Sequence, residues 1–195
     1  PITRLDVAKE AIRDFVENIY KDGNGKDVEI RVVTFNWGSW DDYRNSDWYD
    51  RRLPENEKQF VGANFYTTIN SSDYSSKLTA IDNISIPENM STDITAGINK
   101  AKSELNNFTN KENDNVVIFL GDGEPDKDNT GDTATQANNA ATLLKQSATL
   151  YTIGFGVNGE ATTLLKNMAS YNEDQTKKLY YSANDRDSLL ESFDA

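Results

Sequence analysis

The sequence predicts an α/β fold with a doubly wound, mostly parallel central sheet flanked by helices. Two kinds of segment, and their alternation along the chain, predict it. Segments with apolar residues at helical spacing alternate along the chain with short runs of β-branched and apolar residues. Such alternation produces parallel strands joined by right-handed crossovers. The length of 195 residues suits one domain with a substantial core, so we expect a single domain over 1–195.

The first third of the chain predicts a helix, a strand and a long insertion. Arg4 to Tyr20 has the apolar spacing of a helix that covers a sheet, and Asp22 to Gly25 ends it. Val28 to Phe35 is β-branched and mostly apolar, which favours a strand. The polar, aromatic segment 36–65 contains all three tryptophans and has no sustained period. We expect it to form an ordered loop or hairpin inserted within the domain.

The remaining chain continues the alternation. Helices are predicted over Ser72–Asn83, Asp93–Phe108, Thr133–Gln146, Glu160–Ser170 and Asp185–Phe193. Strands are predicted over Val116–Leu120, Ala148–Phe155 and Lys178–Ser182. The run Val116–Leu120 ends in Gly-Asp-Gly, which is typical of a buried parallel strand whose following loop lies at the C-terminal edge of the sheet.

The composition excludes several classes of function. Acidic residues outnumber basic ones by 32 to 20, and the net charge of -12 repels a phosphate backbone, so we expect no nucleic-acid partner. The chain has no cysteine and no histidine, which excludes thiol nucleophiles, serine-histidine-aspartate triads and ordinary zinc sites. Any metal must therefore be bound by oxygen atoms. No apolar run approaches the roughly 20 residues of a membrane span, so we expect no membrane insertion by this segment.

Several segments, in order, resemble the von Willebrand factor type A family. The helix that begins at Arg4 and the strand after it are similar to the family's first helix and second strand. Ser91 to Ile98 resembles the family's threonine-bearing loop and helix, and Val117 to Asp126 resembles its strand ending in an Asp-Gly-x-Pro turn. Tyr151 to Gly156 adds a later strand. The resemblance covers nearly the whole chain apart from 36–65, and it implies a Rossmann-like von Willebrand A fold and a non-enzymatic adhesion or interaction module.

The resemblance also implies a divalent-cation site. In the family the loop threonine and the turn aspartate bind the metal, and their counterparts here are Thr92 and Asp122. A hydroxyl and a carboxylate suit a hard cation such as Mg²⁺, or Mn²⁺ or Ca²⁺, because these cations prefer oxygen ligands. In the family the bound cation accepts an acidic residue of the partner protein.

The sequence departs from the family at its N-terminus. The family has a central strand ending in Asp-x-Ser-x-Ser directly before the first helix, and residues 1–195 contain neither. Most side-chain ligands that the family implies therefore have no counterpart, so cation binding is conditional on a loop supplied from outside this chain. We expect residues 1–195 to be a fragment that lacks the first strand and takes it from upstream residues or from a second chain.

Thr92 and Asp122 also have simpler interpretations. An Asp-Gly pair after a strand is a common turn signal, and a hydroxyl before a helix is an ordinary N-cap. The order of the two motifs and the apolar strand before Asp122 favour the metal-ligand interpretation. The nearby acidic residues Glu124, Asp126 and Asp128 are expected to form a solvated loop rather than a further cation site.

The aromatic residues of the 36–65 insertion leave two interpretations open. A loop that displays Trp37, Trp40, Tyr43 and Trp48 could bind a partner, because aromatic residues are enriched at interaction hot spots. The same rings could instead form a satellite core that holds the long segment in place.

Two functions from different classes are compatible with the sequence. The first is a module of a bacterial surface or pilus adhesin, extracellular or attached to the cell wall, that binds an acidic residue of a host or matrix protein. The low apolar fraction of 36% is common in exported bacterial surface proteins. An intracellular von Willebrand A-type assembly module is an alternative within the family. The second class is a haloacid dehalogenase-like, Mg²⁺-dependent phosphatase, whose last motif is similar to Gly121-Asp122-Gly123. Thr92 and the Tyr151 to Gly156 strand favour the adhesion family, so we predict no catalytic residue.

Overall fold

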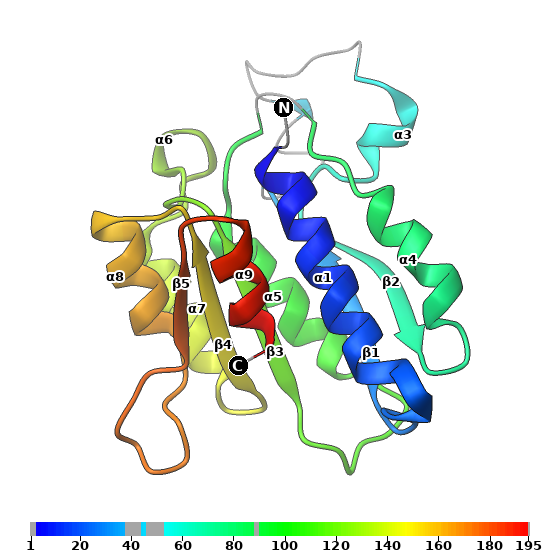
Figure 1. Cartoon of the computed structure of the whole chain (residues 1–195). Helices are drawn as coiled ribbons and strands as arrows, with labels where there is room; N and C mark the ends of the chain where they lie inside the picture. The colour runs from blue at the N-terminus through cyan, green and yellow to red at the C-terminus, as the bar shows by residue number, and fades with distance from the viewer. Residues whose placement is uncertain (1–2, 38–43, 46–52, 88–89, 195) are drawn as a thin grey trace.

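The computed structural model describes residues 3–37, 44–45, 53–87 and 90–194. Its strands lie between two layers of helices (Figure 1). The strands are β1 (Glu29–Thr34), β2 (Asn64–Asn70), β3 (Val116–Gly121), β4 (Thr149–Phe155) and β5 (Tyr180–Ala183). The long helices are α1 (Arg4–Tyr20), α4 (Tyr74–Asp82), α5 (Ile94–Leu105), α7 (Ala134–Leu144), α8 (Gly159–Met168) and α9 (Arg186–Asp194). Short helical segments are η1 (Lys21–Gly23), α3 (Glu55–Lys58) and α6 (Lys127–Thr130). The predicted α/β fold is confirmed.

Helix α1 begins with a capping box. The Thr3 hydroxyl accepts a hydrogen bond from the Asp6 N–H (3.1 Å), and the Asp6 carboxylate accepts one from the Thr3 N–H (2.9 Å). Two donors that the first helical turn leaves unpaired are thereby satisfied. Lys21 caps the other end, and Asp22 follows with a φ of 59°. A positive φ cannot continue a right-handed helix, so the chain turns here toward β1.

The strands form two separate sheets. Strands β1 and β2 pair antiparallel, whereas β3, β4 and β5 form a parallel sheet in that order. Strand β2 was not predicted; it begins inside the expected 36–65 insertion and makes the second half of a hairpin with β1. Thr67 and Ile69, two residues apart on β2, are both buried, which is the alternation expected of a strand with one face against a core.

Strands β1 and β3 run in the same direction although they belong to different sheets. At their N-terminal ends, the N–H and hydroxyl of Thr109, which precedes β3, donate to the Glu29 carboxylate of β1 (3.1 and 2.6 Å). Toward their C-terminal ends, the rings of Phe35 and Phe119 lie 5.1 Å apart. Among the described residues, no strand pairs with β1 opposite β2, nor with β3 opposite β4. The hydrogen-bonded ladder is therefore interrupted between two parallel strand edges.

The core lies on both faces of the strands. Helices α5, α7 and α8 cover one face, where Phe119 of β3 packs in the same cluster as Leu165 of α8. Helices α1 and α9 cover the opposite face of the parallel sheet, where Ile153 of β4 packs in the same cluster as Leu189 of α9. Helix α1 continues over the hairpin, which it covers together with α4 (Figure 1). Within the described residues, no helix is both long and apolar enough to cross a membrane.

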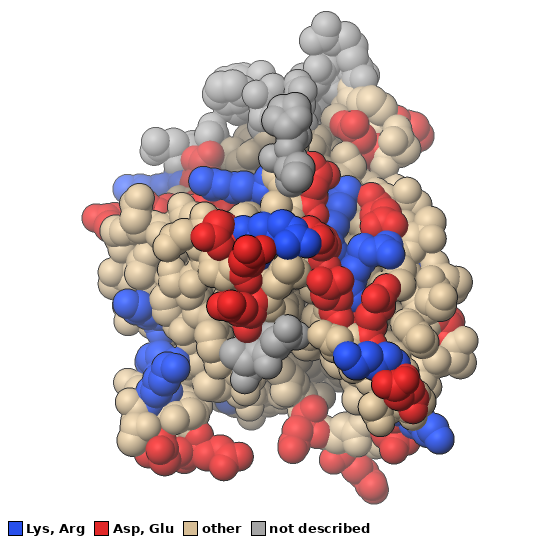
Figure 2. All heavy atoms as spheres, in the orientation of Figure 1, with Lys and Arg blue, Asp and Glu red and all other residues tan. Residues whose placement is uncertain are grey.

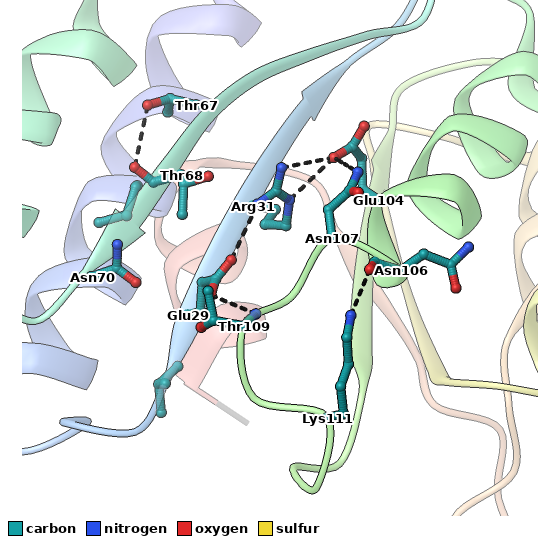
Figure 3. A network of polar contacts seen from close by, with 12 residues as sticks. Glu29, Arg31, Thr67, Thr68, Asn70, Glu104, Asn106, Asn107, Thr109 and Lys111 are labelled. Atoms are coloured by element: carbon teal, nitrogen blue, oxygen red, sulfur yellow. Dashed lines mark hydrogen bonds and ion pairs between the residues drawn. The ribbon is translucent and has the colours of Figure 1, made fainter.

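A largely buried ion-pair network joins β1 to α5 (Figure 3). Arg31 of β1 donates through Nε (3.1 Å) and Nη2 (2.9 Å) to Glu104 near the end of α5, and its Nη1 lies 3.1 Å from Glu29. Glu104 also accepts from Lys100 (2.7 Å) and Asn107 (3.0 Å). Burial alone raises the pKa of the Glu104 carboxyl, but these hydrogen bonds outweigh it and lower the pKa to about 2. The ionised carboxylate therefore holds the end of α5 against β1.

Candidate functional site

Thr92 lies where the hairpin and the parallel sheet meet. It lies two residues before the start of α5, and its carbonyl accepts a hydrogen bond from the Asp126 N–H in the loop after β3 (2.9 Å). The next residue, Asp93, donates its N–H to the carbonyl of Asn36, just past β1 (2.7 Å). Main-chain hydrogen bonds thus attach the Thr92 segment to the C-terminal ends of both β1 and β3.

The N-cap of α5 is Asp93 rather than Thr92. The Asp93 carboxylate accepts from the Ala96 N–H (2.8 Å), which is the usual geometry of a capping carboxylate. The Thr92 hydroxyl is therefore not the capping group of α5.

Asp122 directly follows β3 and is mostly exposed. Its carboxylate lies 3.5 Å from Nη1 of Arg4, at the start of α1, and the two side chains are 61% and 57% exposed. A Cβ atom on Gly156, after β4, would lie 3.1 Å from the same guanidinium, so the absence of a side chain there leaves space for Arg4. Water screens an ion pair this exposed, and it contributes little to stability.

The described residues supply part of a cation site. Thr92 and Asp122 both lie at the C-terminal edge of the strands, on segments that the bond from Asp126 to Thr92 holds together. Their oxygen atoms suit a hard cation. Within the described ranges, however, no group of three or more acidic side chains could hold a metal ion. These residues fit Mg²⁺ as a partial ligand set that needs further oxygen atoms.

The acidic loop after β3 has a structural role. Glu124 is exposed, whereas Asp126 is partly buried and its carbonyl accepts from the N–H (3.0 Å) and hydroxyl (2.6 Å) of Thr130. The short helix α6 begins at the next residue, Lys127. The main chain of this loop therefore organises the turn and contacts Thr92, while Glu124 faces solvent as the sequence predicts.

The base of the insertion is closed by one buried side chain. Asn36, 8% exposed, donates to the carbonyl of Phe60 (2.5 Å) and accepts from the N–H groups of Trp37 and Gly62 (2.7 Å each). One amide therefore binds both the beginning and the end of the insertion. Because the Asn36 carbonyl also accepts from Asp93, the insertion begins beside the candidate site.

Of the predicted partner-binding residues, Trp37 is described and is 3% exposed. It packs against Val61, Leu53 and Met90, and Met90 lies two residues before Thr92. This small cluster attaches the insertion to the Thr92 segment. Outside the described residues lie the other predicted partner-binding residues, Trp40, Tyr43 and Trp48.

Sequence reasoning did not identify Arg4, Asn36 or Asp132 as residues that shape this edge. Asp132 is 3% exposed, and its carboxylate binds the first N–H groups of α5. In the sequence it precedes a threonine and a helical segment, which indicates only a local turn. No short-range pattern signals a contact between residues 38 positions apart.

The surface near α1 and α9 carries charges of both signs (Figure 2). Arg186 of α9 pairs with Glu10 of α1 and with Asp187, and Arg13 of α1 pairs with Asp82. These pairs link α1 to its two neighbouring helices. On the face shown, no broad basic area of the kind that binds nucleic acid is present.

A family model matches almost the whole chain. The model of the von Willebrand factor type A domain matches residues 3–195. No curated protein matches the sequence.

Three solved structures from bacteria match this chain. Two crystal structures of the pilus adhesin SpaC from Lactobacillus rhamnosus GG match with TM-scores of 0.69 and 0.68 at 14% and 16% identity. A von Willebrand factor type A structure from Catenulispora acidiphila matches with a TM-score of 0.64 at 16% identity. These matches cover 98%, 98% and 97% of this chain, which spans only 27%, 27% and 37% of the matched chains. At identities this low, the structural similarity shows only that these proteins share the fold of this chain.

Proposed function

Because this chain belongs to the von Willebrand factor type A family, we propose that it is a non-enzymatic interaction module that binds a partner protein at the C-terminal edge of its strands. The observation that carries this proposal is the meeting of the Thr92 and Asp122 segments through the hydrogen bond from Asp126. The match over residues 3–195 favours this function over the haloacid dehalogenase-like phosphatase.

A divalent cation, Mg²⁺ or alternatively Mn²⁺ or Ca²⁺, would join module and partner. Thr92 would offer a neutral hydroxyl and Asp122 a carboxylate, so these two ligands would leave half of the positive charge of the ion uncompensated. Such an ion attracts an acidic side chain of the partner. The roles of this chain's residues are to hold the ion and to orient the partner's carboxylate.

The cation site would be completed by a strand and loop from outside residues 1–195. The interrupted ladder between β1 and β3 supports this part of the proposal, since both edges run in the same direction and lack a strand partner among the described residues. Unpaired main-chain groups that are buried cost roughly 1 to 3 kcal/mol each. A strand inserted there would end at the edge that carries Thr92 and Asp122, where its following loop could add oxygen ligands.

The insertion would supply a second contact with the partner. Its base is anchored beside Thr92 by Asn36 and by the packing of Trp37 on Met90. A partner that reaches Thr92 and Asp122 would therefore come close to the base of the insertion. We assign Trp40, Tyr43 and Trp48 to this contact, with buried Trp37 anchoring its base.

The partner proposed is an extracellular or host matrix protein, and the module would belong to a bacterial surface or pilus protein. The similarity to the pilus adhesin SpaC supports this setting. The acidic net charge of -12 also supports cation-dependent binding, because the protein's field attracts cations.

Substitution of Asp122 tests the proposal in the intact protein. Asp122→Ala is expected to abolish Mg²⁺ binding measured by calorimetry and to abolish Mg²⁺-dependent attachment to a surface coated with extracellular matrix. Because Asp122 is 61% exposed, stability should change by no more than about 0.5 kcal/mol. Asp114→Ala, in the exposed loop before β3, is the matched control and should behave like wild type. Attachment that persists in EDTA would reject the cation bridge.

A further inference from the structure

Asp132 is a buried carboxylate with a complete set of hydrogen bonds. Its Oδ2 accepts from the N–H groups of Ile94 (2.8 Å) and Thr95 (3.3 Å). Its Oδ1 accepts from the Thr95 hydroxyl (2.5 Å) and the Thr133 N–H (3.0 Å). The side chain is 3% exposed. A buried carboxyl group with this many donors strongly restrains the groups around it.

The donors are mainly the first turn of α5. The N–H groups at the start of a helix have no partner within the helix and carry a partial positive charge. Asp93 satisfies the N–H of Ala96, whereas Asp132 reaches from 38 positions along the chain to satisfy those of Ile94 and Thr95. The start of α5 is thus held by two carboxylates, of which only Asp93 belongs to its own segment.

The segment 121–132 therefore acts on Thr92 in two places. The Asp126 N–H holds the Thr92 carbonyl, and the Asp132 carboxylate holds the helix that begins two residues after Thr92. The same segment carries Asp122. One stretch of chain thus contains Asp122, one of the two candidate metal ligands, and restrains the main chain around Thr92, the other ligand.

We infer that Asp132 is a positioning residue for the candidate cation site: it fixes the start of α5 so that the Thr92 hydroxyl stays directed toward the ion that Asp122 also binds. This inference rests on the proposed function. Asp132 itself does not touch the ion, because its four hydrogen bonds already occupy both of its oxygen atoms.

Three variants of the intact protein separate positioning from general stability. Asp132→Ala removes the carboxylate. Asp132→Asn keeps its shape and one acceptor oxygen, which still reaches the N–H groups of Ile94 and Thr95. Asp185→Ala is the matched control, since Asp185 also caps a helix, accepting from the N–H (2.9 Å) and hydroxyl (2.7 Å) of Ser188 at α9.

The measurements are Mg²⁺ affinity by calorimetry and hydrogen exchange of the peptide covering 91–97 by mass spectrometry. Asp132→Ala is expected to weaken Mg²⁺ binding by about tenfold or more and to speed exchange in 91–97 by a similar factor. Asp132→Asn should give smaller losses of both. Asp185→Ala should change exchange only around α9 and leave Mg²⁺ affinity unaltered.

Two different failures can be told apart. Mg²⁺ affinity within twofold of wild type in both Asp132 variants would overturn the role of Asp132 while leaving the cation proposal intact. Absence of Mg²⁺ binding in the wild-type protein would instead reject the proposed function, and the inference with it. If Asp132→Ala does not fold, Asp132→Asn alone decides: unchanged affinity and unchanged exchange in 91–97 overturn the inference.

Discussion

Glu104 keeps its charge in a mostly buried position because three neighbouring residues bind it. Arg31, Lys100 and Asn107 all contact its carboxylate, and the side chain is 7% exposed. Its pKa of about 2 lies below the ordinary value of 4.5. A carboxyl whose pKa is lower in the folded protein stabilises the fold above its unfolded pKa, and this stabilisation is lost as the pH falls toward the folded pKa.

Acid unfolding should therefore depend on Glu104. Lowering the pH from about 4.5 to about 2 is expected to remove up to roughly 3 kcal/mol of stability through this residue. Glu104→Gln should be less stable than wild type at pH 7, and its stability should fall less steeply over that pH range. Urea unfolding at several pH values measures both. The exposed Glu173→Gln is the control, and equal slopes for wild type and Glu104→Gln would contradict the expectation.

At the level of residues, the sequence predicts those parts of the site that local motifs carry. Thr92 stands out because it precedes a recognisable helix, and Asp122 stands out because it follows a recognisable strand. Arg4, Asn36 and Asp132 do not, because each acts on residues far away along the chain. Their roles come from tertiary packing, which no local spacing reveals.

Helix α5 connects the site to the rest of the domain. Asp93 and Asp132 hold its first turn, and the Arg31–Glu104 ion pair holds its end to β1. Between them, Gly97 packs directly against Phe35, since a Cβ at Gly97 would lie 2.6 Å from the Phe35 ring. The small residue thus allows α5 to approach the end of β1 closely.

Gly97→Ala tests this close approach. Alanine favours a helix over glycine by about 1 kcal/mol, but overpacking against Phe35 costs roughly 1 to 3 kcal/mol. We expect a net loss of about 1 kcal/mol in the free energy of unfolding, measured with urea. Asn99→Ala, on an exposed position of α5, reports the helix preference alone and should not destabilise. Gly97→Ala as stable as Asn99→Ala would show that Phe35 moves aside without cost.

At the level of elements, most helices and strands agree with the sequence, and their ends shift by a few residues. The predicted helix over Asp93–Phe108 is shorter, from Ile94 to Leu105, since Asp93 is its cap. Strand β2 was missed because its polar and aromatic composition continues that of the insertion before it. Its partner β1 was predicted, since a run of β-branched residues indicates a strand even when the pairing partner is unknown.

At the scale of the whole molecule, the described strands are divided between a hairpin and a parallel sheet. The hairpin β1–β2 and the sheet β3–β5 are held together by α5, by the contact of Phe35 with Phe119 and by the link from Thr109 to Glu29. Side chains and helices thus join them, whereas within the described ranges no main-chain ladder does. Composition could not predict this division, because it depends on which strand edges pair in the folded chain.

This division predicts which main-chain N–H groups of the domain exchange their hydrogen with solvent rapidly. Alternate N–H groups of β1 and β3 point away from β2 and β4, so in a polypeptide of residues 1–195 they should exchange at least about a hundredfold faster than the paired N–H groups of the same strands. In the intact protein a strand supplied from elsewhere should protect them and raise the unfolding temperature of the domain.

The measurement is residue-resolved hydrogen exchange on both samples. The paired N–H groups of β4, which has neighbours on both sides, are the internal control. Equal protection of the β1 and β3 groups in both samples, with equal unfolding temperatures, would mean that no strand enters between the two sheets, and the cation site would then have to be completed by other means.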